Sequence, residues 1–361
     1  MTAPIFPRIT IIGLGLIGSS IARAAHEKKL AGTIVGYDHN EIYTAFAHKE
    51  KFIDEAATDL QSAVEDSDLV IIATPPASLS DIAQEIGAHL KPGAIVMDVA
   101  SVKLAAVESI APHLPDNVIF IPAHPIAGSE QKGVRGGRSD LFVRKRVIIT
   151  PKEQPDAELF GVLNRFWSAM GARLEGMPAD IHDLIYGYMS HLPQLIAFCL
   201  EQPLGRYYAQ PEISPLFKTF LRISASDPQL WAEIFELNKE NILKALDRYI
   251  DVITHVHKEL QQAPEGEESK NDEQLAYTVL FPRIVASCLV TTVMEAEKNA
   301  GLPFVRYAGT GFADLSSPAM IPPEADIEQI SAQYKLVEKI IDKFLIRLKM
   351  FRSALASDRT A

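Results

Sequence analysis

The sequence contains little cysteine, and its cationic residues gather in no run. Its 361 residues include only 2 Cys, which is too few for a disulfide framework or a cysteine-rich metal cluster. Lys and Arg number 35 against 46 Asp and Glu, so the formal net charge is −11. A protein that binds a phosphate backbone needs clustered positive charge. We therefore expect a cytoplasmic protein that uses no metal and does not bind nucleic acid.

Long apolar segments are also missing. The most apolar later stretch, residues 284–294, is 11 residues long, whereas a membrane-spanning helix needs about 20. The N-terminal MTAPIFPR lacks the charged-then-apolar pattern of a signal peptide. The sequence therefore predicts no membrane association.

What is present is the composition of a folded globular chain, 47% hydrophobic and 22% charged. The first 150 residues alternate β-branched runs with helical patterns, which is typical of a parallel sheet with crossover helices. Long helical periodicities follow a polar break at 151–156. The predicted strands are 9–12, 33–37, 69–74, 95–99, 118–122 and 147–150. The predicted domains are a nucleotide-binding domain at 1–151, a helical domain at 157–260 and a helical extension at 274–356.

A glycine motif follows the first predicted strand. Gly13, Gly15 and Gly18 form a GxGxxG pattern that opens a helix. The first glycine permits a tight turn, the second lets a pyrophosphate approach the backbone, and the third lets the helix pack on the strand. Asp38 stands 20 residues after Gly18, at the end of the second strand, where a ribose-binding acid is expected. The pattern predicts an α/β domain of the Rossmann type, with a doubly wound parallel sheet.

The acidic residue also indicates which dinucleotide binds. A carboxylate accepts hydrogen bonds from both ribose hydroxyls of NAD, but it repels the 2′-phosphate of NADP by about 4 kcal/mol per charge pair at 4 Å. We therefore expect NAD, although a solvated turn residue remains the alternative for Asp38. The residues expected to contact the cofactor are Gly13, Gly15, Leu16, Ile17, Gly18, Asp38, Thr74 and Pro75.

Polar residues follow two of the later strands. The segments 98–103 (DVASVK) and 123–130 (AHPIAGSE) begin at carboxyl ends of predicted strands, the edge at which open α/β sheets bind ligands. Hydride transfer from an alcohol requires a group that takes the hydroxyl proton, and histidine suits this role near neutral pH. His124 is the best placed of the 10 histidines.

These motifs together resemble a known family. HPIAGSE at 124–130, after DVASVK and the glycine motif, is similar to prephenate dehydrogenase and its relatives, the arogenate and cyclohexadienyl dehydrogenases of tyrosine biosynthesis. The resemblance continues through HLP at 191–193, FLRISASDPQLW at 220–231 and NKEN at 238–241. It covers residues 8 to about 260.

The resemblance implies a site and a reaction. His124 would accept the hydrogen bond of the ring C4 hydroxyl, and Ser101 would orient that histidine. Arg222 would hold a substrate carboxylate through a bidentate pair. Further expected substrate contacts are His191, Ser129, Ser226 and Trp231. The substrate would lose hydride to NAD and its ring carboxylate as carbon dioxide. Neither the choice between prephenate and arogenate nor feedback by tyrosine follows from the sequence, although neutral Gln194 favours prephenate or dual use.

The helical half contains a faint internal repeat. Residues 191–200 (HLPQLIAFCL) align with 280–289 (LFPRIVASCL) at an offset of 89, and 217–220 align with 312–315 at an offset of 95. Two apolar helices also match by chance, so a degenerate duplication is one of two interpretations. Residues 324–356 predict a single amphipathic helix rather than an added regulatory domain. Its apolar positions are Ile327, Ile330, Tyr334, Val337 and Ile341.

The chain departs from the family pattern before Arg222. Family members carry a GGF(K/R)D segment there, but residues 214–219 read SPLFKT, while the repeat has GTGFAD at 309–314. Our hypothesis is that the first copy of the internal repeat keeps the charged pocket. The second copy would then supply the glycine loop that a partner subunit otherwise contributes. The resemblance itself implies a homodimer through the helical domain. The hypothesis implies an internally duplicated monomer instead.

Two other functions remain open from the sequence. One is a different NAD(P)-dependent oxidoreductase, such as a β-hydroxyacid dehydrogenase or an imine reductase, which ordinarily uses another proton donor in place of HPIAGSE. The other is a catalytically silent NAD-binding regulator, which would have no use for Ser101, His124, His191 and Arg222 together.

Overall fold

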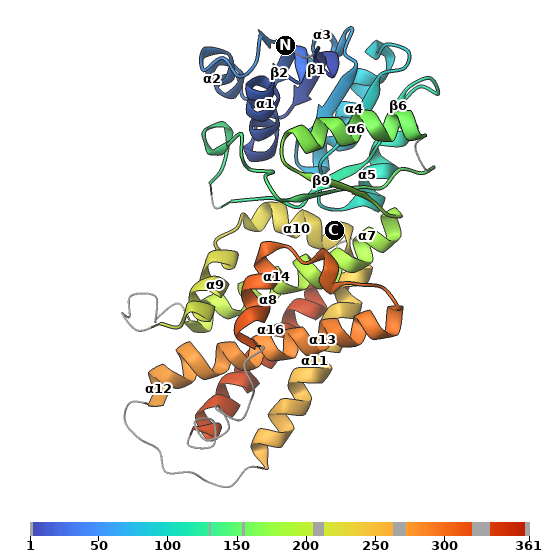
Figure 1. The fold of residues 1–361 in the computed structure, drawn as a ribbon. Coiled ribbons are helices and arrows are strands. Elements are labelled where there is room, and N and C mark those ends of the chain that lie inside the picture. The colour runs from blue at the N-terminus through green and yellow to red at the C-terminus, as the bar shows by residue number, and fades with distance from the viewer. Residues whose placement is uncertain are drawn as a thin grey trace. The chain divides into compact units, whose positions relative to one another are not determined.

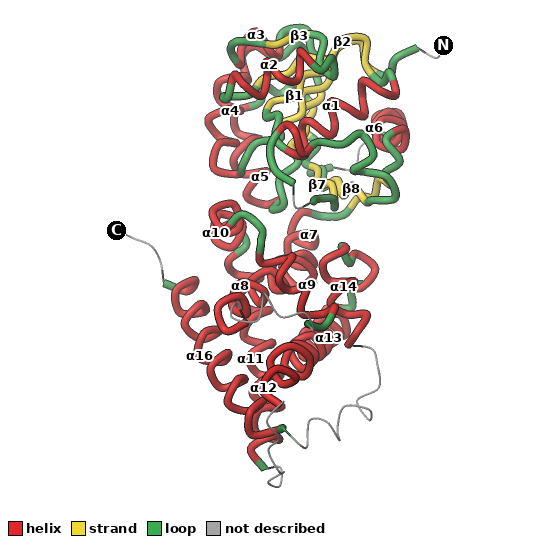
Figure 2. The backbone as a smooth tube through the Cα atoms, turned by 90° about the vertical axis from the view of Figure 1, so that its left-hand side faces the viewer, coloured by secondary structure: helices red, strands yellow, loops and turns green. Residues whose placement is uncertain are grey.

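The computed structural model describes residues 3–129, 131–153, 156–204, 213–262, 272–319 and 333–357. The chain forms two compact units, Met1–Asp183 and Leu184–Ala361. Figure 1 labels the elements of each unit. Helices alternate with strands in the first unit, and the described part of the second unit is helical (Figure 2).

The first unit is built on a parallel sheet in the order β3-β2-β1-β4-β5-β6. This is the strand order of a dinucleotide-binding fold, with β1 and β4 on either side of the point where the order reverses. The predicted α/β fold is confirmed. The strands are β1 (Phe6–Ile12), β2 (Ala31–Tyr37), β3 (Glu55–Ala56), β4 (Leu69–Ile72), β5 (Ile95–Asp98) and β6 (Ile119–Phe120).

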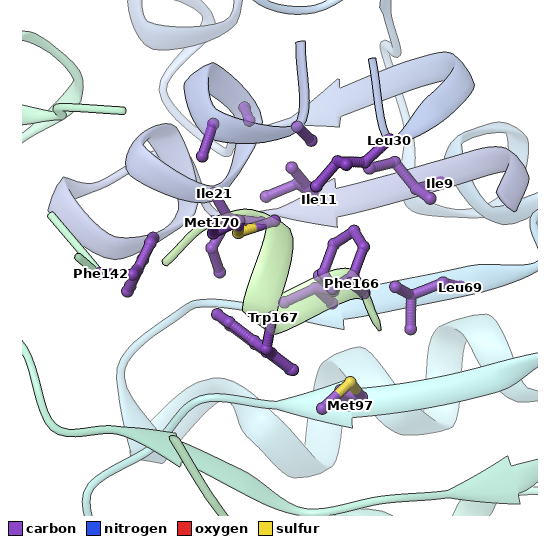
Figure 3. Packing of buried hydrophobic residues seen from close by; sticks show 14 of the residues in the cluster. Ile9, Ile11, Ile21, Leu30, Leu69, Met97, Phe142, Phe166, Trp167 and Met170 are labelled. Atoms are coloured by element: carbon purple, nitrogen blue, oxygen red, sulfur yellow. The ribbon is translucent and has the colours of Figure 1, made fainter. Parts of the chain in front are cut away.

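Alternating residues of the strands face two separate cores, because successive side chains in a strand point to opposite faces. Ile9 and Ile11 of β1 belong to one core, and Ile12 belongs to the other. Figure 3 shows the first core, in which Phe166 and Trp167 pack with the sheet residues. The crossover helices are α1 (Leu16–Lys28), α2 (Glu41–Lys49), α3 (Leu60–Val64), α4 (Leu79–Ile86) and α5 (Lys103–Ile110).

A second sheet corrects one sequence prediction. The run 147–150 was expected in the parallel sheet, but β8 (Arg146–Ile149) pairs antiparallel with β7 (Ala123–Pro125) and parallel with β9 (Arg173–Gly176). The period of a buried apolar run does not say which strand it joins. His124 therefore lies inside a strand of this sheet and not in a loop after the parallel sheet.

The predicted boundary near 151–156 also lies inside the first unit. Helix α6 (Ala157–Ala169) begins there, with the Asp156 carboxylate accepting the Leu159 amide as an N-cap. Its Phe166 and Trp167 are fully buried in the first core, so α6 and β9 belong to the nucleotide-binding unit. Residues 154–155 of the predicted break lie outside the described residues.

The second unit consists of helices. Helix α7 (Ala179–Tyr186) spans the division, and a π-helical turn, Gly187–His191, follows it. The next helices are α8 (Leu192–Leu204), α9 (Pro215–Ser224), α10 (Pro228–Leu237) and α11 (Lys239–Gln261). The later elements are α12 (Asp272–Leu275), a second π-helical turn at Ala276–Leu280, α13 (Phe281–Ala300), α14 (Thr310–Ala319) and α16 (Tyr334–Ala356).

The predicted C-terminal helix is present as α16, with Val337 and Ile341 fully buried. The predicted Ile327 and Ile330 lie outside the described residues, as does most of the acidic stretch at 264–273. One described helix, Glu273–Ala300, is long and apolar enough to span a membrane, which the shorter run 284–294 did not indicate. Its Phe281, Val285 and Leu289 are fully buried inside the unit, as in a core helix.

Candidate functional site

The glycine turn joins β1 to α1 at the carboxyl edge of the parallel sheet. Gly13 has φ +91°, a conformation that favours glycine, and an added Cβ would lie 2.7 Å from the Ala73 carbonyl oxygen. A Cβ on Gly18 would lie 1.9 Å from the Gly13 carbonyl oxygen, so this glycine allows helix and strand to pack closely. A Cβ on Gly15 would meet nothing within 4 Å. The middle glycine thus faces open space, as the approach of a pyrophosphate to the helix N-terminus requires.

Asp38 is not a solvated turn residue. It is 8% exposed, and its Oδ2 accepts the Leu14 amide at 2.7 Å while its Oδ1 accepts the Asn40 amide at 2.9 Å. The carboxylate therefore holds the glycine turn and stays at the end of β2. Thr74 and Pro75 follow β4, the strand beside β1, and the Thr74 hydroxyl bonds the Ser78 hydroxyl at 2.9 Å. These residues fit an NAD ribose and pyrophosphate.

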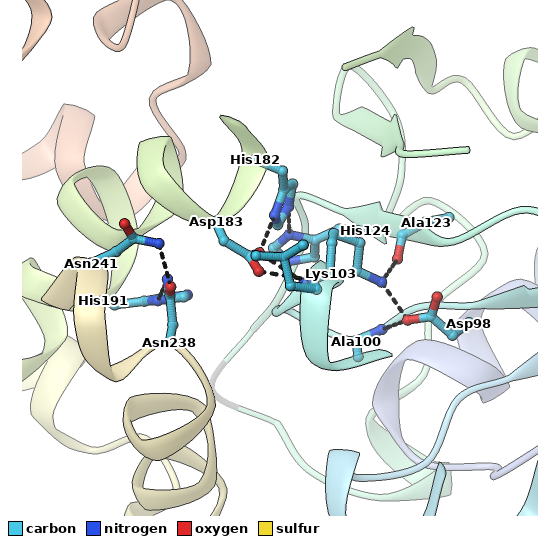
Figure 4. A network of polar contacts seen from close by, with 11 residues as sticks. Asp98, Ala100, Lys103, Ala123, His124, His182, Asp183, His191, Asn238 and Asn241 are labelled. Carbon is cyan, nitrogen blue, oxygen red and sulfur yellow. Dashed lines mark hydrogen bonds and ion pairs between the residues drawn. The ribbon is translucent and has the colours of Figure 1, made fainter. Parts of the chain in front are cut away.

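His124 belongs to a chain of polar side chains that ends in a carboxylate. Its Nδ1 lies 2.9 Å from Nε2 of His182, and Nδ1 of His182 lies 2.8 Å from Oδ1 of Asp183. Dashed lines in Figure 4 join His182 to His124 and to Asp183. His182 and Asp183 are 0% and 1% exposed. Helix α7 supplies both, and β7 supplies His124.

The hydrogen bonds assign the tautomers of both histidines. Asp183 accepts two backbone amides at the start of α5, from Lys103 at 2.8 Å and Leu104 at 2.9 Å, which favours an ionised carboxylate at the positive end of that helix. An ionised carboxylate only accepts, so Nδ1 of His182 donates to it and Nε2 of His182 accepts. His124 then donates from Nδ1. In its neutral form, its Nε2 is the basic nitrogen.

A buried ion pair supports the same region. The Lys103 ammonium donates to the Asp98 carboxylate at the end of β5, and to the Ala123 carbonyl at 2.6 Å. Both side chains are 0% exposed. Burial raises the pKa of Asp98 and lowers the pKa of Lys103, and the opposite charge of the partner works against each shift. The pair fixes the backbone next to His124 and the start of α5.

The second unit holds His191 in a defined orientation. Its ring packs edge-on to Trp231, with the ring centroids 5.9 Å apart, and its Nδ1 lies 3.0 Å from the Asn238 amide nitrogen. The Asn241 amide donates to Asn238 Oδ1 at 2.8 Å, which orients the Asn238 amide (Figure 4). Asn238 therefore donates to His191, and the imidazole proton lies on Nε2. His191 can donate a hydrogen bond to an anionic substrate oxygen.

The other predicted residues are described within their own units. Arg222, near the end of α9, forms an ion pair with Asp314 of α14 at 2.8 Å, and their side chains are 39% and 51% exposed. Ser226 follows α9, where its amide bonds the Ile223 carbonyl. Ser129 accepts the Gln131 amide at 3.2 Å. Ser101 lies between the buried Asp98 and Lys103, after β5.

The sequence reasoning missed His182 and Asp183. The adjacent His and Asp were the available signal, but the boundary drawn near 151–156 assigned them to the helical domain. Asp98 and Lys103 were part of the sequence motif at 98–103, but no role was predicted for either. Because His182 is 58 residues from His124, only the fold brings the two rings together.

Comparisons with known proteins identify the family of this chain. Residues 21–176 match the family model of the prephenate dehydrogenase nucleotide-binding domain, and residues 178–269 match that of the prephenate dehydrogenase dimerization domain. The cyclohexadienyl dehydrogenase of Zymomonas mobilis is 34% identical over 257 residues, which cover 68% of this chain and 86% of that protein. The prephenate dehydrogenase of Bacillus subtilis is 30% identical over 264 residues, 70% of each chain.

Solved structures show the same relationship. A prephenate dehydrogenase from Aquifex aeolicus, solved with hydroxyphenyl propionate and NAD⁺, is 32% identical with a TM-score of 0.62, and the match covers 72% of this chain and 91% of that one. The arogenate dehydrogenase of Synechocystis is 26% identical with a TM-score of 0.59, over 71% of this chain and 93% of that one. This chain therefore belongs to the prephenate dehydrogenase family and is an NAD-dependent dehydrogenase.

Proposed function

We propose that this chain oxidatively decarboxylates prephenate, arogenate or both on the route to tyrosine. The observation that carries the proposal is the chain from His124 through His182 to Asp183, which leaves the Nε2 of His124 as a base. NAD⁺ supplies the hydride acceptor. The chain is similar to dehydrogenases named for prephenate, for arogenate and for cyclohexadienyl compounds, which supports both substrates and does not choose between them.

The role of His124 follows from the balance of the reaction. The C4 hydroxyl gives its proton to Nε2 of His124, and the C4 hydrogen would leave with its bonding electron pair as a hydride to bound NAD⁺. The C1–carboxylate bond then breaks and carbon dioxide leaves. The bond's electron pair makes the ring aromatic, and the C4 oxygen takes the proton back from His124. His182 accepts a hydrogen bond from the imidazolium that forms on His124. The negative charge of Asp183, on the other side of His182, stabilises that imidazolium.

The remaining residues bind and orient the substrate in this proposal. Arg222 pairs with a substrate carboxylate, and His191 donates from Nε2 to a substrate oxygen. Trp231 supports the His191 ring, and Ser129 and Ser226 supply hydroxyls. The Ser101 hydroxyl orients His124 in this proposal, in addition to the hydrogen bond between His124 and His182.

One spectrophotometric assay tests the function. The chain is given NAD⁺ with prephenate, arogenate, a β-hydroxyacid or no substrate, and NADH is followed by absorbance. We expect NADH with prephenate or arogenate. NADH with the β-hydroxyacid alone would favour the other oxidoreductase class, and no NADH with any substrate would favour a silent NAD-binding protein. Steady-state constants for prephenate and arogenate then decide the preference.

Two substitutions test the proposed roles. His124→Asn is expected to lower kcat by about 10²–10⁴, the scale of losing one acid–base group, with NAD affinity unchanged. Arg222→Gln is expected mainly to raise KM, because the carboxylate contact is shared by the ground and transition states. Undiminished turnover in the His124 variant would dismiss this base.

A further inference from the structure

The helical unit contains the same series of elements twice. The π-helical turns Gly187–His191 and Ala276–Leu280 have the same length and an offset of 89 residues, and each leads into a long helix. A π-helical turn is rare, so its repetition at one offset is unlike a chance match of two apolar helices. The two cysteines share this offset, and both are buried in α8 and α13.

The next elements repeat at an offset of 95. Helix α9 is followed at this spacing by α14, with 10 residues in each, and α11 by α16, with 23 residues in each. The buried positions of the two long helices also agree. The equivalent, nearly fully buried pairs are Ile242 and Val337, Leu246 and Ile341, Tyr249 and Phe344, and Ile253 and Leu348.

The two copies contact each other as two subunits do across a two-fold axis. In such an isologous interface an element meets its own counterpart, and every other contact occurs twice. Here α9 packs against α14 and α11 against α16, while α8 meets α16 and α13 meets α11. Tyr249 and Phe344, which occupy one position of the repeat, are in ring contact with centroids 6.5 Å apart. Figure 2 shows α11 and α16 side by side.

Polar contacts between the two long helices run in both directions. His257 and Arg352 are equivalent positions, and each reaches the opposite long helix. His257 pairs with Glu338 at 2.9 Å, and Arg352 pairs bidentately with Asp247 at 2.5 and 2.9 Å. The side chains differ, and the partner positions differ by four residues, because Glu338 is equivalent to residue 243 and not to Asp247. What the two contacts share is that each joins one long helix to the other.

A further cross-copy pair joins two residues that the copies do not share. Arg222 pairs with Asp314 at 2.8 Å. At an offset of 95, the first copy has Thr219 where the second has Asp314, and the second has Ser317 where the first has Arg222. One copy keeps the cation and the other keeps the anion that contacts it. The pair is therefore made once in the chain.

We propose that the second copy, residues 272–356, takes the place of a partner subunit's dimerization domain and positions Arg222 through Asp314. The family model for that domain matches residues 178–269 and so covers the first copy only. The Asp314 carboxylate holds the guanidinium of Arg222 in the orientation that receives a substrate carboxylate. This role for Asp314 rests on the function proposed above, whereas the pairing of the two copies does not.

The first test is the mass of the intact chain in solution. Because the second copy covers the face on which a partner would pack, we expect sedimentation equilibrium to give the monomer mass of 39.7 kDa at micromolar concentration, with and without NADH. Twice that mass would overturn the replacement of the partner. This measurement does not depend on activity.

The second test is the substitution Asp314→Asn, with Asp251→Asn as the matched control. Asp251 is an exposed carboxylate on α11 of the same unit. Loss of an exposed ion pair predicts a KM for the preferred substrate raised about two- to fivefold, with kcat and Tm unchanged. Asp314→Glu, which keeps the charge, should restore part of the loss. A KM equal to that of the control, or a lower one, would overturn the positioning role.

The outcomes separate this inference from the proposed function. A wild-type chain that makes no NADH from prephenate or arogenate overturns the function and the carboxylate role of Asp314 with it, while the mass still decides the pairing of the copies. If the chain is active and Asp314→Asn leaves its KM unchanged, only the positioning of Arg222 by Asp314 is overturned.

Discussion

The hydrogen bonds from His124 through His182 to Asp183 predict how the substitution His182→Leu changes turnover. Leucine is apolar and of similar size, so it removes the acceptor for Nδ1 of His124 without emptying the site. Asp183 keeps its two amide donors from α5. The buried carboxylate of Asp183 therefore keeps these two hydrogen bonds. The main effect of the substitution is that His124 loses the acceptor for its Nδ1 proton.

The size of the effect follows from the bond that is lost. A hydrogen bond to a charged group contributes about 1.5–3 kcal/mol, and His124 is charged only after it has taken the proton. This energy appears in the transition state and not in the ground state, so kcat should fall about 10- to 150-fold. KM for the substrate should stay nearly constant.

The assay is steady-state NADH formation over a range of pH. Without an acceptor at Nδ1, His124 is protonated less readily, so the acid limb of the kcat/KM profile should move to lower pH. His182→Gln should recover part of kcat, because its amide can both accept and donate. The control is His113→Leu, which removes a histidine bonded to Ser80 at 3.1 Å in the same unit.

Two results would refute this reasoning. One is a kcat for His182→Leu within twofold of the His113→Leu control. The other is a combination of three observations: kcat falls, the acid limb of the kcat/KM profile stays in place, and His182→Gln recovers none of the lost kcat. That combination would indicate that His182 has a structural role only. Circular dichroism melting of each variant separates loss of fold from loss of turnover.

Three further predictions concern the nucleotide turn, the buried ion pair and the cysteines. Gly18→Ala should lower Tm because its Cβ would clash with a backbone carbonyl, whereas Gly15→Ala should keep Tm and raise the Kd for NADH about tenfold, as measured by fluorescence titration. Lys103→Met should destabilise the fold by about 3–5 kcal/mol in urea unfolding, because it leaves a buried carboxylate unpaired; a loss below 1 kcal/mol would contradict this. Burial raises the pKa of Cys199 and of Cys288 to about 12, so both thiols stay protonated at pH 7 to 9. A disulfide reagent should label neither in the folded chain and both in urea, and labelling that accelerates with pH in the folded chain would be the contrary result.

The α/β nucleotide-binding fold and the family could be predicted from the sequence alone. The glycine motif, the spacing to Asp38 and the apolar runs are local patterns, and local patterns report strand, turn and helix directly. The internal repeat was also visible in the sequence as a weak match. The structure gives it a repeated π-helical turn and helices of equal length.

The contacts between residues that are far apart in the sequence could be seen only in the folded chain. His182 lies 58 residues from His124, Asp183 lies 80 residues from Lys103, and Asp314 lies 92 residues from Arg222. The pairing of β8 with β7 and the end of the first unit at Asp183 are also long-range features, and Phe166 and Trp167 of α6 join the core of that unit. Such contacts depend on where distant elements pack, and a periodicity of 2 or 3.6 residues carries no information about that.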